Sequence, residues 1–365
     1  MSKSYAKFYK CALQVNPYSY IKYRGLEHEM TEEQYNESIY NYCIKNNISI
    51  IGLADHGNVD KSKKLREYLS SKGILVFPGF EISTSEKIHI VCLFSENTEE
   101  QELERYLGEL GLSNPEDGNS PSTMSFHDIT QRVIDRGGFW YAAHITSDNG
   151  VLKGKHNNLW KSDKLVAAQI PSKKNEVNPN YINILKNKDP NYQKKTPFAL
   201  INAKDVSKPE DLDLDTASCL IKMSKLNFES FKLAFRDPKA RVKLNFDINN
   251  KYPHSSINEI KISMGYLDNL SLDLSPNLNT IIGGRGAGKS TFIELIRYAL
   301  DINPMSRNAN TSFENICKSN LGIGGIVELV VTSHAQYGKQ FKIIKRYNED
   351  PIIKDINNNV SSYTV

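Results

Sequence analysis

Nine consecutive residues in the last third of the chain have the spacing of a phosphate-binding loop, Gly-x-x-x-x-Gly-Lys-Ser. They are Gly283, Gly284, Arg285, Gly286, Ala287, Gly288, Lys289, Ser290 and Thr291. Glycines let backbone N–H groups surround an anion, and the N-terminus of a following helix adds partial positive charge. Lys289 would reach the β- and γ-phosphates, and the Ser290 hydroxyl would be a ligand of Mg²⁺. The sequence therefore predicts a nucleoside triphosphate site with Mg²⁺.

The segments on either side of this loop have the pattern that the loop requires. An apolar run, residues 278–282, leads directly into Gly283 and predicts a strand. After the loop, apolar residues recur every three or four positions over 292–300, which predicts a helix. A glycine-rich turn that fits the motif by chance is the alternative. The order strand, loop, helix favours the phosphate-binding interpretation.

A second group of reactive side chains lies near the ends of predicted strands in the first two thirds of the chain. The group consists of His56, Glu81, His89, His144 and Asp205. In a sheet or barrel of parallel strands the carboxyl ends of the strands meet on one face. Imidazoles and carboxylates that converge there would form a site for Zn, Mn or Fe. The alternative is that each residue caps a strand or is a hydrogen-bonded core histidine.

The elements that would position these side chains alternate along the chain. Apolar runs at 48–53, 74–77, 88–94, 139–143, 165–170 and 198–201 predict strands, and amphipathic segments at 32–45, 61–71, 99–110 and 126–135 predict helices. Thr31 with Gln34, and Ser125, are typical of helix N-caps. Alternating strands and helices predict an α/β sheet or barrel.

The composition is that of a soluble protein of two domains. The chain has 365 residues, 39% hydrophobic and 24% charged, and no apolar run long enough to span a membrane. The N-terminus lacks the apolar segment of a secretion signal. Five scattered cysteines without a Cys-x-x-Cys pair predict reduced thiols and a cytoplasmic location. A net charge of +4 does not by itself indicate nucleic-acid binding.

Two polar segments bear on the domain organisation. Residues 171–196 are rich in Lys and Asn. They are predicted to form either a solvent-exposed loop without further function or a loop that faces nucleic acid. Charges, Asn and Pro also accumulate between 235 and 254, where we expect the connection between the domains. The predicted organisation is a barrel-like domain at 1–240, a linker at 241–256 and a nucleotide-binding domain at 257–365.

The first domain resembles the PHP (polymerase and histidinol phosphatase) superfamily. The resemblance rests on four segments in order, Gly52-Leu-Ala-Asp-His56, Pro78-Gly-Phe-Glu81, His89-Ile-Val-Cys-Leu-Phe94 and Ala142-Ala-His144, and covers about residues 5–212. It implies a distorted (β/α)₇ barrel and a metal-dependent phosphoesterase. By motif, His56, Glu81, His89, His144 and Asp205 fall on metal-ligand positions.

The departures from this family concern its metal ligands. The His-x-His pair expected on the first strand is Gln14-x-Asn16, no histidine lies near Tyr20, and the closing Asp-x-His is Asp205-Val-Ser207. Amide ligands bind zinc-like metals far more weakly than imidazole does. Glu81, His89 and His144, with Asp205 nearby, could still hold one ion. We therefore expect a degenerate barrel, weakly active or inactive, in which a cluster of several metals is broken.

The second domain is similar to the N-terminal lobe of ABC-type ATPases of the SMC/RecF group. Strands expected at 259–263 and 270–274 precede the phosphate loop, and a hairpin expected at 326–331 and 341–346 follows the loop helix. A PHP-like barrel joined to such a lobe resembles TrlF-type PHP-ATPase proteins. That resemblance implies ATP as the nucleotide and a role in DNA transactions, including defence against phage.

A strand ending in Asp-Glu and a signature motif are not found after the loop helix. We expect either a fragment of a longer ATPase or a short variant, and slow unassisted hydrolysis. Three hypotheses follow. The first is an ATP-binding module that acts with DNA, a partner protein or a second copy of itself. No membrane partner is expected. The second is a metal-dependent phosphoesterase or nuclease regulated by ATP. The third is a protein with a structural role, in which neither the nucleotide site nor the metal site still functions.

Overall fold

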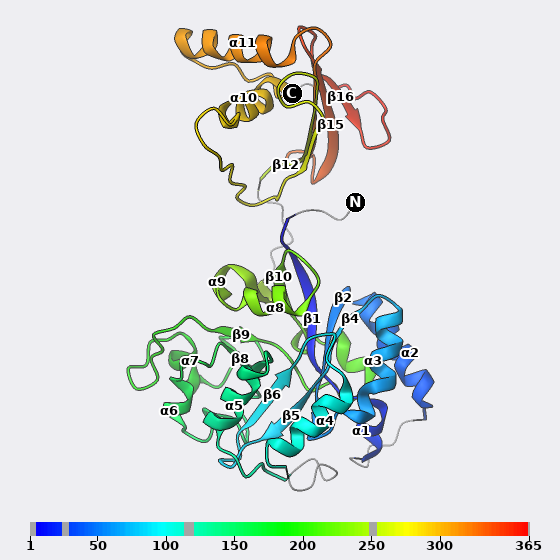
Figure 1. The fold of residues 1–365 in the computed structure, drawn as a ribbon, viewed down its shortest axis with the longest axis vertical. Coiled ribbons are helices and arrows are strands. Elements are labelled where there is room, and N and C mark those ends of the chain that lie inside the picture. Colours follow the sequence, from blue (N-terminus) through cyan, green and yellow to red (C-terminus); the bar gives the residue numbers. More distant parts are fainter. Residues whose placement is uncertain (1–4, 24–28, 113–119, 248–253, 364–365) are drawn as a thin grey trace. The chain divides into compact units, whose positions relative to one another are not determined.

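The computed structural model describes residues 5–23, 29–112, 120–247 and 254–363. The fold divides between residues 248 and 249 into two compact units, Lys7–Ile248 and Asn249–Val365, the latter together with Met1–Ala6 (Figure 1). The division lies within the predicted linker 241–256. The first residues of that segment form β11 (Val242–Leu244) of the N-terminal unit, and residues 248–253 lie outside the described part of the chain.

The N-terminal unit is built on two sheets, one five-stranded in the order β11-β10-β1-β2-β4 and one six-stranded in the order β3-β5-β6-β7-β8-β9. In the first sheet β1, β2 and β4 pair parallel and β10 runs antiparallel to β1. In the second, β5, β6 and β7 pair antiparallel, whereas β7, β8 and β9 pair parallel. The other strands are β1 (Lys7–Val15), β2 (Ile48–Leu53), β3 (Asp55–His56), β4 (Leu75–Phe77), β5 (Gly79–Ser83), β6 (His89–Leu93), β7 (Phe139–Ala142), β8 (Ala167–Gln169), β9 (Ala199–Ile201) and β10 (Cys219–Met223).

Helices flank these sheets (Figure 1). The α-helices of this unit are α1 (Tyr18–Tyr23), α2 (Glu32–Lys45), α3 (Lys63–Ser71), α4 (Glu100–Glu109), α5 (Phe126–Asp135), α6 (Asn157–Trp160), α7 (Pro179–Leu185), α8 (Phe228–Ala234) and α9 (Pro238–Arg241). The 3₁₀ turns are η1 (Asp60–Ser62), η2 (Pro209–Asp213), η3 (Asp215–Ala217) and η4 (Asn245–Asp247). The predicted caps are confirmed, because Thr31 and Gln34 form a capping box on α2 and the Ser125 side chain accepts from Asp128 N on α5.

The predicted α/β alternation is confirmed, because each helix and strand predicted in this unit overlaps an observed one. The strands that were not predicted are β1, β3, β5, β10 and β11. β5 begins at Gly79, directly after Pro78, and the pair Pro78-Gly79 is typical of a turn in the sequence. In the structure a Cβ on Gly79 would lie 2.1 Å from the carbonyl oxygen of Cys92, so the close approach of β6 requires glycine there. The unit is a mixed α/β fold with two sheets, and the (β/α)₇ barrel implied by the resemblance stays a prediction.

The apolar core between the two sheets also fixes α8. Leu13 on β1 and Val91 on β6 belong to one buried cluster, although the strands are in different sheets. The ring of Phe231 on α8 packs 5.0 Å from that of Phe77 and 4.9 Å from that of Phe139, centroid to centroid. Aromatic contacts of this kind contribute about 0.5–1.5 kcal/mol each beyond the area they bury. The core therefore holds the strand ends that carry the polar side chains.

The C-terminal unit has one antiparallel sheet in the order β13-β12-β14-β15-β16. The predicted hairpin is confirmed, with Ile326 opposite Arg346 and Ser333 opposite Lys339. Phe292 and Leu295 of α10 and Phe313 of α11 pack in one buried cluster with the sheet. The elements are β12 (Ser256–Ser263), β13 (Leu270–Asp273), α10 (Lys289–Ala299), α11 (Arg307–Leu321), β14 (Ile326–Ser333), β15 (Lys339–Arg346) and β16 (Ile352–Asp355).

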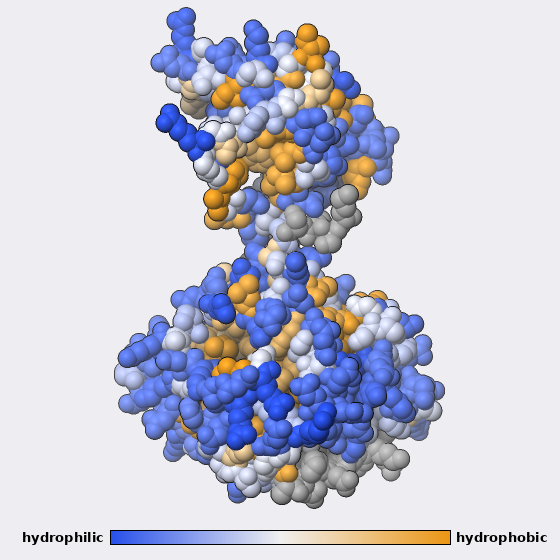
Figure 2. Space-filling model, in the orientation of Figure 1, coloured by the Kyte–Doolittle hydropathy of each residue, from blue (hydrophilic) through white to orange (hydrophobic). Residues whose placement is uncertain are grey.

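The strand predicted at 278–282 is wrong. This segment has no regular structure, and Leu278 and Ile282 are 86% and 92% exposed. Apolar side chains also appear at the surface of this unit in Figure 2. A strand needs a neighbour to satisfy its backbone N–H and C=O groups, and none of the described strands pairs with this segment. The apolar run therefore remains an exposed loop in the structure.

Candidate functional site

The phosphate loop has the backbone geometry that its sequence predicts. Gly286 and Gly288 have φ of +81° and +79°, values that L side chains rarely adopt. Gly288 is the N-cap of α10, and Lys289 is the first residue of the helix. The first N–H groups of α10 have no partner within the helix, so they are available to an anion. The loop thus combines backbone donors with a helix N-terminus.

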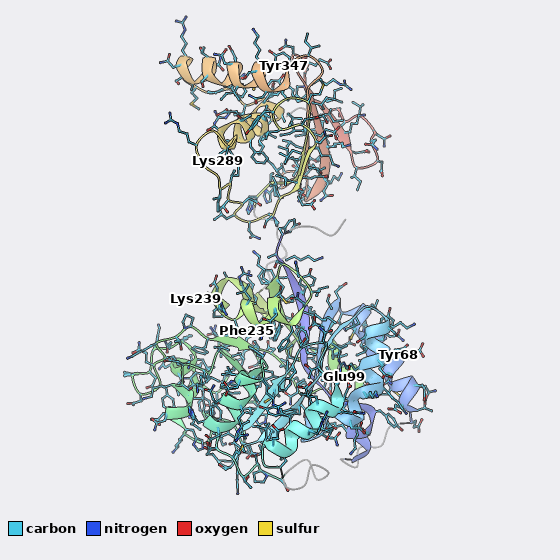
Figure 3. The ribbon with its side chains drawn as sticks, in the orientation of Figure 1. Tyr68, Glu99, Phe235, Lys239, Lys289 and Tyr347 are labelled. Atoms are coloured by element: carbon cyan, nitrogen blue, oxygen red, sulfur yellow. The ribbon has the colours of Figure 1, made fainter. Side chains whose placement is uncertain are left out.

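The Lys289 side chain folds back over its own loop. Its Nζ donates to the carbonyl oxygens of Gly283 at 2.8 Å and Gly284 at 2.6 Å. Figure 3 labels Lys289 in the C-terminal unit. A triphosphate would offer this ammonium group negatively charged oxygens in place of neutral carbonyls. Charge-assisted hydrogen bonds are about twice as strong as neutral ones, so Nζ can exchange these partners for phosphate.

A hollow of about 340 Å³ borders the loop. It is lined by Tyr266, Asn320 and the loop residues 286–291. A Cβ on Gly288 would lie 2.7 Å from Cε1 of Tyr266, so the aromatic ring lies directly against the loop. None of the described residues lining this hollow is acidic. Tyr266 and Asn320 were missed in the sequence, since nothing in their local pattern marks them as neighbours of the loop.

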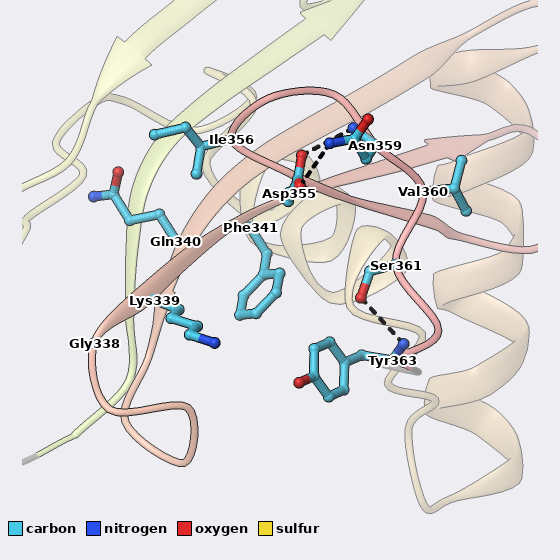
Figure 4. Close-up of a pocket in the computed structure, with 10 residues that line it drawn as sticks. All are labelled: Gly338, Lys339, Gln340, Phe341, Asp355, Ile356, Asn359, Val360, Ser361 and Tyr363. Atoms are coloured by element: carbon cyan, nitrogen blue, oxygen red, sulfur yellow. Dashed lines mark hydrogen bonds between the residues drawn. The ribbon is translucent and has the colours of Figure 1, made fainter.

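A larger hollow of about 620 Å³ lies elsewhere in the same unit (Figure 4). Phe341 and Tyr363 line it with ring centroids 5.4 Å apart, and Asn359 donates from Nδ2 to Asp355 at 3.0 Å. This hollow is bounded by β15 and β16 and does not include the phosphate loop. The helix N-terminus and Lys289 thus border the smaller hollow and not the larger one.

The N-terminal unit brings three of the five predicted ligand residues, His56, His89 and His144, around the carboxylate of a fourth, Glu81. Glu81 is 2% exposed and lies opposite His56 in the register of β5 and β3. His89 starts the antiparallel neighbour β6, and His144 follows β7. His144 has a φ of +26°, which is rare for a residue other than glycine and stores backbone strain at this position.

Each oxygen of Glu81 has two polar neighbours. Oε1 lies 2.7 Å from His89 Nδ1 and 3.4 Å from His144 Nε2. Oε2 lies 3.0 Å from His56 Nε2 and accepts from Gln14 Nε2 at 2.6 Å. His144 Nε2 is also 3.2 Å from His89 Nδ1. Three imidazoles and one amide therefore converge on a single buried carboxylate.

The electrostatics of this cluster favour an ionised Glu81. Burial raises the pKa of Glu81, but the imidazoles of His56, His144 and His89 outweigh it, so its pKa lies well below the usual range. Burial lowers the pKa of His144, yet its interaction with Glu81 raises it above the ordinary value overall. The cluster thus holds a buried negative charge beside three imidazoles.

The donor set fits one metal ion. One ligand atom each from His56, Glu81 and His89 lies within 4.8 Å of the other two, and His144 adjoins this group through Glu81 and His89. Two ligand atoms that each lie about 2.0–2.1 Å from a tetrahedral metal ion are about 3.3 Å from each other. The Glu81 oxygens lie at similar distances from His56 Nε2, at 3.0 Å, and from His144 Nε2, at 3.4 Å. The buried Nδ1 atoms of His56 and His144 have no hydrogen-bond partner. His56 therefore joins Glu81, His89 and His144 as a candidate ligand.

Asp205 lies beside this group and has other partners. Its Oδ1 accepts from Asn16 Nδ2, and its Oδ2 accepts from the Tyr20 hydroxyl at 3.2 Å. The Tyr20 ring also stacks on His56, with centroids 5.4 Å apart and planes 12° from parallel. Burial and the charge of Glu81 raise the pKa of Asp205. The Asn16 amide and the Tyr20 hydroxyl therefore donate the hydrogen bonds that the Asp205 carboxylate needs, so it does not require a second cation beside it.

Two further positioning residues were missed by the sequence reasoning. Gln169, the last residue of β8, accepts the backbone N–H of His144 at its Oε1 at 2.8 Å. Its Nε2 donates to the Ala203 carbonyl at 2.6 Å. Asn149 lies 3.2 Å from His89 Nε2 through its Nδ2. A lone Gln or Asn carries no sequence signal of such a role, because its partners are distant along the chain.

Comparison with known proteins assigns the C-terminal unit to a class. Residues 256–363 match the family model described as AAA domain, so this segment is an AAA-type ATPase domain. Such a domain implies ATP and Mg²⁺. The chain also matches an uncharacterized protein of Streptococcus pneumoniae serotype 4, with 28% identity over 123 residues, 31% of this chain and 45% of the relative. The match thus spans less than half of that relative's length.

Two solved structures are among those similar to the chain. A complex of Endonuclease Q with a 27-mer duplex that contains an abasic lesion has 9% identity and a TM-score of 0.43, covering 63% of this chain and 57% of the other. The lesion-specific endonuclease PfuEndoQ from Pyrococcus furiosus has 9% identity and a TM-score of 0.46, covering 86% and 83%. At this level neither likeness bears on function. Among the described helices, none has the length and apolar character needed to cross a bilayer.

Proposed function

We propose that the chain is an ATP-binding module of the SMC/ABC-like kind joined to a degenerate PHP-type domain that holds one metal ion. It acts in a DNA-related process such as repair or defence against phage, with a partner protein or a second copy of itself. The observation that carries the proposal is the phosphate loop at the N-terminus of α10, inside the segment that matches an ATPase domain.

Each residue of the nucleotide site has a role in this proposal. Backbone N–H groups of residues 283–288 surround the phosphates, Lys289 turns from its loop carbonyls to the β- and γ-phosphates, and Ser290 ligates Mg²⁺. Mg²⁺ bound with the nucleotide neutralises phosphate charge. Because the described lining has no carboxylate to position water, hydrolysis by this chain alone is slow. ATP then acts chiefly as a ligand that joins two lobes.

A second candidate function is a metal-dependent phosphoesterase or nuclease that the ATPase domain regulates. The cluster of His56, Glu81 and His89, with His144 beside it, favours it, because three protein ligands are enough to hold an ion and leave a fourth position for water or substrate. When bound, the metal would supply Lewis-acid chemistry. Gln14 and Asn16 count against a competent multi-metal site, since each amide donates to a carboxylate that a second ion would need.

The test separates these candidates by two measurements on the full chain. Titration with an ATP analogue in Mg²⁺, against Lys289→Ala, measures the nucleotide site. Elemental analysis after dialysis without chelator, against Glu81→Ala/His144→Ala, measures the metal site. Nucleotide binding without metal supports the ATP-binding module alone. Metal together with cleavage of a phosphodiester supports the enzyme. Equal ATP binding by wild type and Lys289→Ala would rule out the principal proposal.

A further inference from the structure

A row of unpaired cations lies on one face of the sheet formed by β1, β10 and β11. Phe8 pairs with Lys222, Lys10 pairs with Leu220, and Leu220 pairs in turn with Lys243. Residues directly opposite each other, or two apart on one strand, share a face of a sheet. The face therefore carries Phe8, Lys10, Lys222 and Lys243, and Arg241 lies two residues before Lys243. We call these five residues the basic face.

The basic face lies at the opposite end of β1 from the metal cluster. β1 runs from Lys7 to Val15, with Gln14 and then Asn16 near Glu81 and Asp205. At about 3.3 Å per residue, Lys10 is about 13 Å along the strand from Gln14. The other side of these strands contributes Cys11, Ile221 and Val242 to the core. The basic face is thus a separate surface of the N-terminal unit.

The cations of this face are crowded and lack anionic partners. Lys222 and Lys243 place Nζ 5.8 and 5.0 Å from the centroid of the Phe8 ring. Within the described residues, none of the four cations forms an ion pair. Asp213, which interacts with the charge of Lys10 without forming an ion pair with it, is already bound by Lys45 at 2.6 Å and by Asn46 at 2.8 Å. Burial, together with the charges of Arg241 and Lys243, lowers the pKa of Lys222.

Such an arrangement costs free energy in the absence of an anion, because like charges repel on a partly buried surface. A ligand with several negative charges would offset the repulsion among all the cations of the basic face. The face is a stretch of sheet with its cations spread over three adjacent strands, about 4.8 Å apart. An extended polymer suits this surface better than a small anion does, because a small anion needs donors that converge on one point.

We propose that the basic face binds the phosphate backbone of a nucleic acid. The choice of polymer rests on the proposed DNA-related function. The ammonium groups of Lys222 and Lys243 lie 5.8 and 5.0 Å from the centroid of the Phe8 ring. The contacts are therefore with phosphates rather than with stacked bases, and binding is independent of sequence. Lys239, an exposed residue of α9 labelled in Figure 3, lies two residues before Arg241 and adds to the positive field at this edge.

The experiment measures binding of the full chain to a short fluorescent DNA duplex of random sequence, and to its single strand, by anisotropy over a range of salt. EDTA is present, so the metal cluster does not contribute, and Lys289→Ala measured in the same buffer shows how much of the binding comes from the phosphate loop. For wild type we expect binding that weakens with salt. For Lys222→Ala/Lys243→Ala we expect weaker binding to every sequence and a log–log salt slope smaller by about two.

Matched variants separate the surface from total charge and from folding. Lys63→Ala/Lys161→Ala removes the same charge from two exposed lysines elsewhere in the unit and should leave the slope unchanged. Lys222→Arg/Lys243→Arg keeps the charges and should keep the binding. Thermal unfolding of the alanine variant should occur at the wild-type temperature or above, because repulsion is relieved.

Three outcomes would overturn the inference: no DNA binding by wild type, equal salt slopes for wild type and the alanine variant, or tighter binding to polyglutamate than to DNA. ATP binding and metal content of the same preparations test the proposed function separately. A chain that binds ATP and metal but not DNA would refute only the basic face.

Discussion

Gln14 Nε2 donates to Glu81 Oε2 at 2.6 Å across 67 residues of sequence. The amide thereby supplies the buried carboxylate with a neutral donor at a position where the resemblance to PHP proteins implies an imidazole metal ligand. Asn16 does the same for Asp205. The two amides stabilise the carboxylates without a second cation, because each donates an N–H bond to an oxygen. Glu81 and the three imidazoles around it therefore remain as candidate ligands for one ion.

We expect Glu81→Gln to remove the metal. Glu81 contacts all three imidazoles of the cluster, so a neutral side chain there loses both a charged ligand and the group that orients the others. Elemental analysis should find about one equivalent of Zn, Mn or Fe in wild type and almost none in the variant. Glu109→Gln, which alters an exposed ion pair with Arg136, is the control. A variant with wild-type metal content would refute the assignment.

Gln14→His/Asn16→His should enlarge the metal site. Both residues are buried beside the carboxylates, and imidazole binds zinc-like metals more tightly than an amide does. Metal content should rise from about one toward about two equivalents, and slow cleavage of a chromogenic phosphodiester should appear. Asn36→His, another substitution of a buried amide in the same unit, controls for added imidazole. Unchanged metal content in a folded double variant would show that the amides are not what limits the site.

Tyr20→Phe should weaken metal binding without abolishing it. The hydroxyl donates to Asp205 and the ring stacks on His56, so Tyr20 orients two members of the site. Loss of such an outer partner typically costs about tenfold or more in metal affinity. Competition with a chromogenic chelator measures the affinity. Tyr40→Phe, on α2, is the matched control. An affinity equal to that of wild type would limit Tyr20 to a packing role.

Lys289→Ala should weaken ATP binding by about tenfold to a hundredfold, since hydrogen bonds to charged groups contribute about 1.5–3 kcal/mol. The wild-type ammonium is held 2.6–2.8 Å from two loop carbonyls, close to the place where the phosphates would bind. Isothermal titration with a non-hydrolysable ATP analogue gives the dissociation constant. Lys318→Ala, an exposed change on α11, should bind as wild type does. Equal affinities for wild type and Lys289→Ala would remove the phosphate loop from the mechanism.

A buried lysine in the N-terminal unit predicts a pH dependence of stability. Lys194 is 3% exposed, its Nζ donates to the carbonyls of Trp160 and Ser162, and burial lowers its pKa from 10.5 to about 8. Between these two pKa values the unfolded chain holds more protons than the folded one, so stability rises with pH. The contribution is about 3 kcal/mol over that window.

Urea unfolding at several pH values from about 7.5 to about 10 measures this contribution. In Lys194→Met the free energy of unfolding should rise less with pH than it does in wild type. Lys195→Met changes an exposed neighbour and should keep the wild-type dependence of the unfolding free energy on pH. Because tyrosines and cysteines titrate alike in both variants, the difference between them reports on Lys194. Parallel pH profiles for wild type and Lys194→Met would contradict the lowered pKa.

The features that the sequence alone determined are local. The capping box of Thr31 and Gln34 depends on residues three apart, and the helix that follows Gly288 depends on apolar residues three or four apart. The phosphate loop was found in the same way, because its glycines and Lys289 act through backbone geometry within nine residues. Its role as part of an ATPase domain is supported by the match over residues 256–363.

Tertiary structure decided what depends on pairing between distant segments. The apolar run at 278–282 has the local pattern of a strand, yet strand formation needs a neighbour, and the described sheet provides none. The partners of Glu81 and Asp205, Gln14 and Asn16, come from residues 67 and 189 positions away. Local propensity cannot specify such contacts, because burial and hydrogen bonding at a strand end depend on which strands the fold places beside it.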